Sequence, residues 1–309
     1  MSDDGKRRLP VIGDEPQTGR RTFMNAFATA AGAVAAGVAT AGCDTPEIAD
    51  LFRQHYRRLT DEDKRELIAR LEALSLQEHG VRAHISDPPP VPGVEFAYAL
   101  DLSTCTGCRQ CEYACAAENN TPRDPEMHYI RVLELERGSF DLEEAEHDYE
   151  GTVPREGKMY MPVSCMQCAD PPCVSACPVD ATWQEADGIV VIDYDWCIGC
   201  RYCQAACPYQ ARHFNFSEPN LRPSDINPDQ GLLSNRVRPR GVMEKCHFCL
   251  HRTRRGLLPA CQEACPVGAR KFGNLNDPTS EVRFILETQQ VYVLKEELGT
   301  LPRFFYYFG

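Results

Sequence analysis

Sixteen of the seventeen cysteines stand in four groups of four, and their spacing constrains the fold more than any other feature. The first and third groups follow C-x2-C-x2-C-x3-C, the second follows C-x2-C-x4-C-x3-C, and the fourth widens its middle gap to eleven residues. Every group closes on x3-C, so the pattern is an internal repeat. The groups are Cys105, Cys108, Cys111 and Cys115; Cys165, Cys168, Cys173 and Cys177; Cys197, Cys200, Cys203 and Cys207; and Cys246, Cys249, Cys261 and Cys265.

This spacing is typical of iron–sulfur ligation. Three thiolates at two-residue intervals can surround one cubane cluster, whereas the fourth points away and, in two-cluster ferredoxins, ligates the other cluster. Gly107 and Gly199 suit such loops because glycine tolerates a positive φ and lets the backbone approach the sulfurs. Pro178, Pro208 and Pro266 each follow a fourth cysteine, where the fixed φ and missing donor help to turn the chain. We therefore expect iron–sulfur clusters.

Zinc and disulfide bonds are the two alternatives. A structural zinc site takes four ligands, usually from two CxxC elements, and it does not require a CxxCxxC triplet with a fourth cysteine before proline. Disulfide bonds are common in exported proteins. However, cysteines two residues apart and repeated in fours do not suit bridges that close loops. Iron–sulfur ligation explains the pattern better than either.

The N-terminal segment, residues 1–42, resembles a twin-arginine export signal. Arg20 and Arg21 precede Phe23 and an alanine-rich apolar run, Ala26–Gly42. The resemblance implies export of a folded protein, which suits a chain whose clusters are built in the cytoplasm. The alternative is a short buried helix that follows an ordinary arginine pair.

The remaining cysteine, Cys43, is a candidate for lipidation. It follows Thr40-Ala41-Gly42, which resembles a bacterial lipobox with Thr40 in place of the usual leucine. We expect a lipid-modified N-terminus at Cys43. The alternative is an unmodified thiol in a signal that is cleaved nearby or retained.

Residues 43–93 are expected to form a helical tether and a proline-rich linker before the cysteine-rich domain, residues 94–309. A helix is predicted over residues 48–79, with Thr60 and Asp63 spaced as a capping box. Its apolar stripe at helical spacing favours a packing helix over a partner-binding one; the stripe is Leu67, Ile68, Leu71 and Leu74. Residues 87–93 read as a stiff linker, and Phe96–Leu102 as a strand that leads to the first cysteine group.

Charge and hydropathy argue against two further classes of protein. The chain has 33 lysine and arginine residues against 45 aspartate and glutamate residues, a formal net charge of −12. It has no basic excess to neutralise a phosphate backbone, so we expect no nucleic-acid partner. No stretch reaches the roughly 20 apolar residues of a spanning helix, so we expect that the mature chain does not span a membrane.

Four segments carry a resemblance to a known family: Tyr98–Cys108, Asp195–Cys203, Glu244–Cys249 and Val291–Arg303. They are similar to the four-cluster ferredoxin-like iron–sulfur subunits of dimethyl sulfoxide, polysulfide and tetrathionate reductases. The resemblance covers roughly residues 94–309. It implies an α+β fold of two nested ferredoxin-like [4Fe–4S] modules with loop insertions, preceded by a helical N-terminal extension. In that family the first cysteine group pairs with the fourth, and the second pairs with the third.

The resemblance also implies four ligand sets that exchange their fourth cysteines. The first set is Cys105, Cys108, Cys111 and Cys265; the second is Cys246, Cys249, Cys261 and Cys115; the third is Cys165, Cys168, Cys173 and Cys207; the fourth is Cys197, Cys200, Cys203 and Cys177. Some relatives replace one ligand and carry a three-iron cluster. Because all sixteen positions are cysteine here, we expect four [4Fe–4S] clusters.

The function that the resemblance implies is electron transfer without catalytic residues of its own. Such a subunit connects an integral membrane quinone-binding subunit, of the polysulfide-reductase membrane-subunit type, with a catalytic molybdoenzyme or a multihaem cytochrome. The signal would place it on the periplasmic face of the cytoplasmic membrane. The alternative is a freestanding exported polyferredoxin; the insertions at 124–160 and 215–243 favour the complex. His247 and His251 beside the fourth group are expected to be polar neighbours, with tuning of a cluster potential as the alternative.

Overall fold

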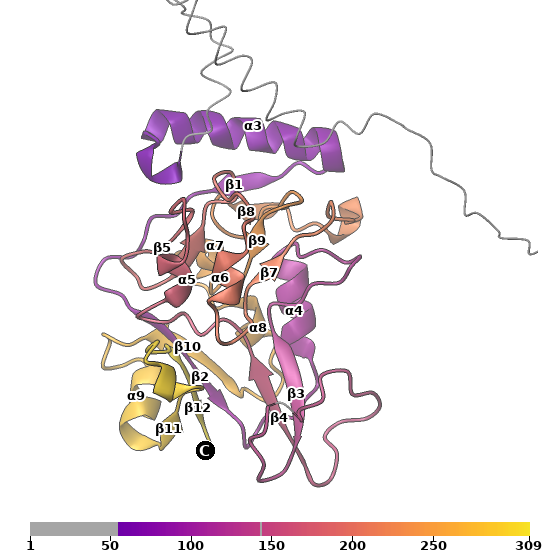
Figure 1. Ribbon diagram of the computed structural model, residues 1–309, viewed down its shortest axis with the longest axis vertical. Helices are drawn as coiled ribbons and strands as arrows, with labels where there is room; N and C mark the ends of the chain where they lie inside the picture. Colours follow the sequence, from indigo (N-terminus) through magenta and orange to yellow (C-terminus); the bar gives the residue numbers. More distant parts are fainter. Residues whose placement is uncertain (1–54, 143) are drawn as a thin grey trace, which may run out of the picture. The chain divides into compact units, whose positions relative to one another are not determined.

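In the computed structural model, which describes residues 55–142 and 144–309, the two ends of the cysteine-rich region meet in one four-stranded sheet. Strand β2 pairs antiparallel with β10 and parallel with β12, and β12 pairs antiparallel with β11 (Figure 1). The strands are β2 (Phe96–Asp101), β10 (Arg270–Asn274), β11 (Val291–Tyr292) and β12 (Phe304–Tyr307). The segment before the first cysteine group therefore lies beside the segment that follows the fourth.

Strand β2 is buried on both of its faces. On one face Tyr98 stacks on Phe304, with ring centroids 4.9 Å apart. On the other, Ala97 and Ala99 share a small core with helix α9 (Glu281–Thr288). The alternation of large and small side chains lets a layer pack on each face, and the predicted strand is confirmed except at its last residue.

The cysteine groups lead into five short helices, four of which pack in two pairs. These helices are α4 (Gln110–Glu118), α5 (Pro172–Ser175), α6 (Tyr202–Ala205), α7 (Leu250–Thr253) and α8 (Ala260–Glu263). Helix α4 packs against α8, and α5 packs against α6. This joins the first group to the fourth and the second to the third. The predicted α+β fold of two nested ferredoxin-like modules is confirmed.

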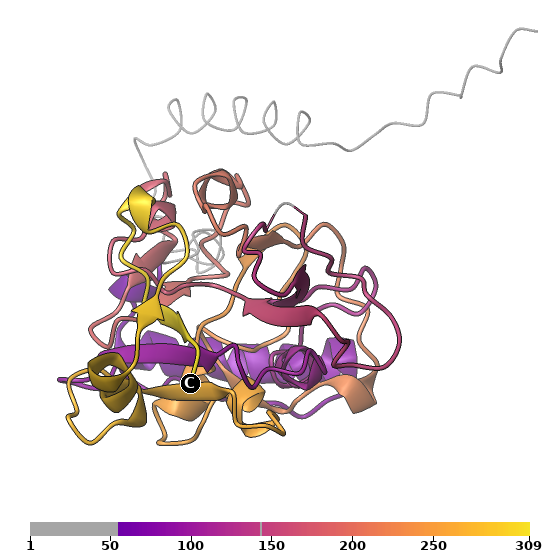
Figure 2. The ribbon, with the colours of Figure 1, turned by 90° about the horizontal axis from the view of Figure 1, so that it is seen from below.

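Four two-stranded sheets complete the sheet structure of the described residues (Figure 2). The insertion at 124–160 builds most of the hairpin of β3 and β4, and the insertion at 215–243 carries β8 and η2. The antiparallel pairs are β3 (Arg131–Glu136) with β4 (Lys158–Val163), β5 (Thr182–Gln184) with β6 (Val190–Ile192), and β7 (His213–Phe214) with β9 (Met243–Glu244); β1 (His84–Ser86) pairs parallel with β8 (Asp229–Gly231). Two 3₁₀ turns are η2 (Pro223–Asp225) and η3 (Glu296–Leu298).

The predicted helix over 48–79 begins later than expected. A 3₁₀ turn, η1 (Tyr56–Arg58), is followed by α3 (Asp61–His79), and Thr60 between them has an extended backbone. Thr60 and Asp63 form the predicted capping box. Because an N-cap residue is non-helical, the cap starts a new helix at Asp61 and separates it from the residues before it. The start of the predicted helix, Cys43 and the arginine pair all lie outside the described residues.

Residues 55–93, the described part of the expected tether and linker, belong to the same compact unit as the cysteine-rich region. Leu67, Ile68 and Leu71 of α3 pack on a small core with Ile85 of β1, whereas Leu74 is 36% exposed. The parallel pairing of β1 with β8 adds backbone hydrogen bonds to this contact. In Figure 1, α3 lies across the end of the body that carries β1 and β8. The packing-helix interpretation is confirmed, because the apolar stripe packs α3 against β1.

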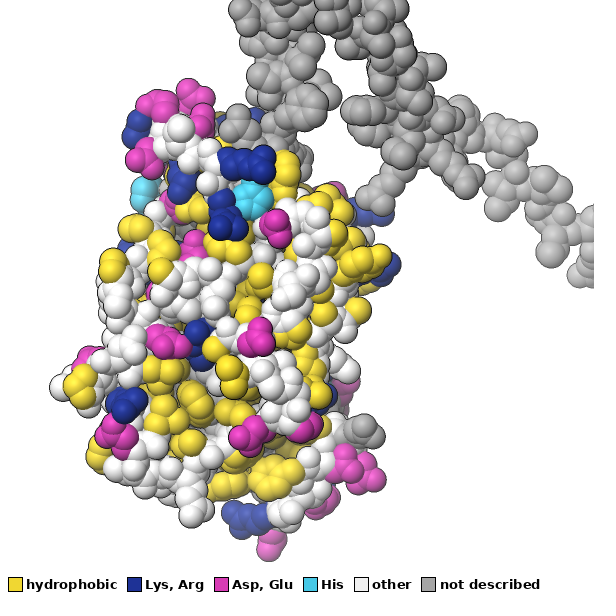
Figure 3. Space-filling view, turned by 60° about the vertical axis from the view of Figure 1, so that its left-hand side comes forward, with side chains coloured by type: hydrophobic (Ala, Val, Ile, Leu, Met, Phe, Trp, Pro, Cys, Tyr) yellow, Lys and Arg dark blue, Asp and Glu magenta, His cyan; other side chains and the backbone are white. Residues whose placement is uncertain are grey.

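Charged side chains of both signs gather at the end that α3 covers, and hydrophobic side chains show over much of the body below it (Figure 3). Of the helices in the described ranges, none is both long enough and apolar enough to cross a bilayer.

Candidate iron–sulfur cluster sites

The first and third cysteine groups use the same loop conformation. Gly107 and Gly199 have φ values of +75° and +67°, and the arginines two residues later, Arg109 and Arg201, are also left-handed. A Cβ at Gly107 would lie within 2.5 Å of ring carbons of Tyr160. At Gly199 it would overlap a carbonyl oxygen of the neighbouring chain segment. The positive φ at both glycines confirms the prediction. The space also requires glycine, but the nearest atoms belong to Tyr160 and Gly241 and not to the sulfurs.

The prolines after the fourth cysteines coincide with short helices. Helices α5, α6 and α8 have four residues each, and a cysteine–proline pair follows each of them. Helix α4 contains Cys115, which no proline follows, and continues to Glu118 over nine residues. Because proline cannot donate the next helical hydrogen bond, it ends α5, α6 and α8 early.

Three of the four predicted ligand sets line a pocket each. The cysteines of the first set surround one pocket, those of the second surround another, and those of the fourth surround a third. The pockets are alike in size, with about 330, 350 and 320 Å³ of non-atom space. Each set takes its fourth cysteine from a different group. The structure therefore brings together cysteines that lie far apart in the chain, such as Cys105 and Cys265 of the first set.

The cysteines of the third set are brought together as well. The thiols of the other three, Cys165, Cys173 and Cys207, lie close enough to Cys168 to raise its pKa. Cys207 comes from the third group, and its partners come from the second. All four sets therefore show the same exchange of a cysteine between paired groups.

The donor chemistry of these sets fits iron–sulfur clusters. Burial raises the pKa of the Cys105 thiol to about 11 and those of Cys168 and Cys246 to about 12. Binding of a metal centre would favour the thiolate form of these side chains. No three histidine, cysteine, aspartate or glutamate side chains within 55–142 and 144–309 converge on a single metal ion. The thiols of three sets instead line pockets of about 320–350 Å³, which suit a group larger than one ion. Buried nitrogen atoms of Arg212 and Arg270 beside the pockets have no protein acceptor, and cluster sulfides would accept from them.

Several sulfur atoms already receive hydrogen bonds from residues that the sequence did not single out. Asn119 lies one helical turn after Cys115, and its Nδ2 donates to Cys115 Sγ at 3.4 Å. Tyr98 Oη and Cys261 Sγ are 3.4 Å apart. Hydrogen bonds to cluster sulfurs are among the factors that set a reduction potential. The one-turn spacing could have indicated Asn119, whereas the position of Tyr98 depends on the sheet.

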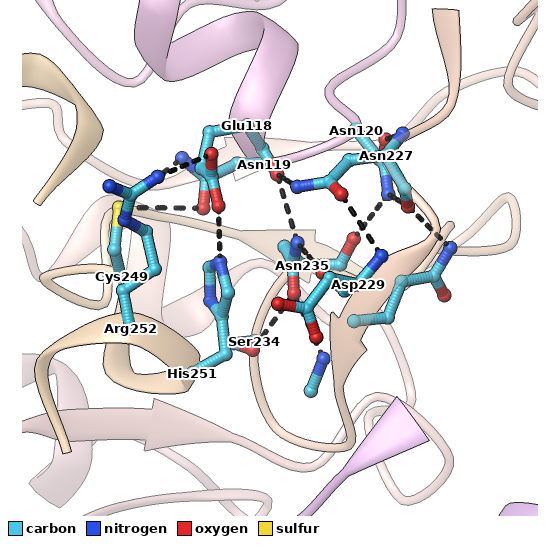
Figure 4. Close-up of polar contacts among 12 residues, drawn as sticks. Glu118, Asn119, Asn120, Asn227, Asp229, Ser234, Asn235, Cys249, His251 and Arg252 are labelled. Atoms are coloured by element: carbon cyan, nitrogen blue, oxygen red, sulfur yellow. Dashed lines mark hydrogen bonds and ion pairs between the residues drawn. The ribbon is translucent and has the colours of Figure 1, made fainter. Parts of the chain in front are cut away.

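The end of α4 anchors the 215–243 insertion beside the second set (Figure 4). The Glu118 carbonyl oxygen accepts from Asn235 Nδ2 at 2.9 Å, and the Asn120 side chain donates to the Asn235 carbonyl at 2.8 Å. Glu118 Oε1 also lies 2.8 Å from His251 Nε2. His251 is therefore held by the protein at Nε2, whereas its Nδ1 has no protein partner. His247, in contrast, is buried, lines the second pocket and has no protein hydrogen-bond partner at either ring nitrogen.

Two nested modules with four converging cysteine sets define a four-cluster ferredoxin-like protein. Comparison with known proteins agrees with this class: two families, both described as "4Fe-4S dicluster domain", match residues 157–223 and 196–269.

Three relatives show the family more closely. A subunit of the selenate reductase of Mesobacillus selenatarsenatis is 38% identical over 252 residues, which are 78% of this chain and 80% of that protein. The iron–sulfur cluster-binding subunit of the menaquinone reductase of Nitratidesulfovibrio vulgaris is 38% identical over 242 residues, covering 69% of this chain and 88% of that protein. A subunit of the polysulfide reductase of Wolinella succinogenes is 35% identical over 212 residues, covering 68% and 93%.

The chain therefore belongs to the family of iron–sulfur subunits of the dimethyl sulfoxide, selenate, tetrathionate and polysulfide reductases. It is the electron-transfer subunit of an oxidoreductase complex, and it carries four [4Fe–4S] clusters.

Proposed function

We propose that this chain relays single electrons through its clusters in the order first, second, third and fourth set, between a quinone-reactive membrane subunit and a catalytic or cytochrome partner. Contacts between neighbouring sets support this order. Arg270 lines both the first and the second pocket. Gln167, in the loop of the third set, donates to the carbonyl of Cys246 at 2.8 Å. Arg212 lines the fourth pocket and donates to Cys173 of the third set.

The two ends of this series are the points where redox partners would approach. Cys200 of the fourth set is exposed, and the apolar side chains of Ile198, Tyr202 and Phe216 near it are 58–64% exposed. Exposed apolar groups of this kind favour a docked protein. At the other end, Val267 lines the first pocket and is 42% exposed. Each cluster, when bound, takes up and releases one electron, so clusters in series between these ends form a path.

We also propose that the chain works on the periplasmic face of the cytoplasmic membrane, exported in folded form and anchored by a lipid on Cys43. Arg20 and Arg21 before the apolar run support export, and a quinone is the substrate named for the menaquinone reductase relative. A formal charge of −12 opposes binding to anionic lipid headgroups, so a protein partner or a lipid anchor would hold the subunit.

Purification from native membranes in mild detergent tests both proposals. We expect a membrane subunit to co-purify, a quinol analogue to reduce the clusters, and the intact mass to show a chain that begins at Cys43 and carries a lipid. A chain recovered alone, with clusters that quinol does not reduce, would favour the freestanding polyferredoxin. An unmodified Cys43 or a retained signal would contradict the anchor without affecting the relay.

A further inference from the structure

Six lysine and arginine residues are buried in the described parts of the chain, and they fall into two classes. Three form ion pairs with carboxylates: Arg236 with Asp195, Arg238 with Glu244, and Arg303 with Glu95. The other three form no such pair within the described residues, and we call them the junction cations: Arg212, Lys245 and Arg270. A buried charge without a counter-charge is strongly unfavourable, so these three positions need a separate explanation.

Arg270 lies between the first and second sets. It begins strand β10 and lines both pockets. The thiols of Cys111 in the first set and Cys261 in the second lie close enough to interact electrostatically with its guanidinium. Its guanidinium lies 5.6 Å from the centre of the Tyr98 ring, whose hydroxyl also contacts Cys261. One guanidinium nitrogen, Nη2, has no acceptor in the protein.

Lys245 lies between the second and third sets. Its ammonium donates to the carbonyl oxygens of Val190 and Cys246, the latter at 2.7 Å. Gln167, which stands between Cys165 and Cys168 in the loop of the third set, donates to the same Cys246 carbonyl. The thiols that act most strongly on the ammonium are those of Cys165 and Cys246, one from each set.

Arg212 lies between the third and fourth sets. Its Nη2 donates to Cys173 Sγ of the third set at 3.1 Å and to Thr182 Oγ1 at 2.9 Å. The same side chain lines the fourth pocket and has Cys203 of that set as a neighbour. Its Nε and Nη1 have no acceptor in the protein.

We propose that Arg270, Lys245 and Arg212 each act on the two clusters that flank them, and raise the reduction potentials of both. A [4Fe–4S] cluster with four thiolates has a charge of about −2 when oxidised and about −3 when reduced. A nearby cation therefore favours the reduced form, and more strongly in a low-dielectric interior. A carboxylate partner would cancel this field. The junction cations also reduce the repulsion between neighbouring clusters that are reduced together.

A redox titration of the purified holoprotein, followed by electron paramagnetic resonance, tests the proposal with Lys245→Met. Methionine keeps an unbranched side chain of similar length and removes the charge. We expect the midpoint potentials of the second and third clusters to fall, while those of the first and fourth stay unchanged. Lys245→Arg keeps the charge and should preserve all four midpoint potentials. No shift, a uniform shift of all four, or an equal shift in the arginine variant would overturn the proposal.

Arg270→Gln extends the test to another junction. Here the midpoint potentials of the first and second clusters should fall. The matched control is the double variant Arg238→Gln with Glu244→Gln, which removes a buried pair of zero net charge and should leave all four potentials in place. If a junction variant loses iron, the missing clusters must be the two that flank it; loss of a distant cluster instead would contradict the proposal. The titration uses a chemical reductant and the chain alone, so its outcome is independent of the proposed membrane partner.

Discussion

Cys115→Ser should damage the second cluster and spare the first, although Cys115 belongs to the first cysteine group in the chain. The reason is geometric, because Cys115 lines the pocket of Cys246, Cys249 and Cys261, and the first pocket has four other cysteines. We expect a loss of up to about four irons per chain, the content of one cubane. Iron analysis together with cluster-resolved spectroscopy measures the loss.

The matched control is Cys111→Ser. Cys111 lies one turn earlier on the same helix, α4, and both side chains are buried, so local damage to the helix should be similar. However, Cys111 lines the first pocket. The two variants should therefore remove different spectroscopic signals. If both affect the same cluster, the exchange of cysteines between groups is wrong.

Gly107→Ala should prevent assembly of the first cluster. A Cβ at this position would overlap the ring of Tyr160, which is buried and donates a hydrogen bond to Glu134 at 2.9 Å, so the ring has little freedom to move. Left-handed strain of about 1–2 kcal/mol adds to an overpacking cost of about 1–3 kcal/mol. We expect the first-cluster signal to be lost, as measured by iron content and electron paramagnetic resonance.

Gly138→Ala provides the control for backbone strain alone. Gly138 also has a positive φ, +90°, but a Cβ there would meet no atom within 4 Å. This variant should lose only about 1–2 kcal/mol of stability and keep all four clusters. Equal iron loss in both variants would show that the Tyr160 contact is not what makes Gly107 necessary.

The sequence was sufficient where a local pattern determines the structure. Cysteine spacing located the cluster loops, the glycine at position 107 marked a left-handed residue, and Thr60 with Asp63 marked a helix start. Each of these depends on residues a few positions apart. The predicted helix over 48–79 was wrong at residues 55–60, because Thr60 is the N-cap of a helix that begins at Asp61.

Contacts between distant segments could not be predicted in the same way. Gln167 reaches the Cys246 carbonyl across 79 positions, and β1 pairs with β8, which lies in a distant insertion. The junction cations look like ordinary basic residues in the sequence. Their proposed role depends on burial, on the lack of a carboxylate partner and on the order of the cysteine sets. Only the folded chain shows these three features.

The most direct test of the four-cluster assignment is the iron and acid-labile sulfide content of anaerobically purified protein. Four complete cysteine sets predict about sixteen irons and about sixteen sulfides per chain, with no stoichiometric zinc. About twelve irons would mean that one set is empty, and zinc in place of iron would contradict the assignment altogether.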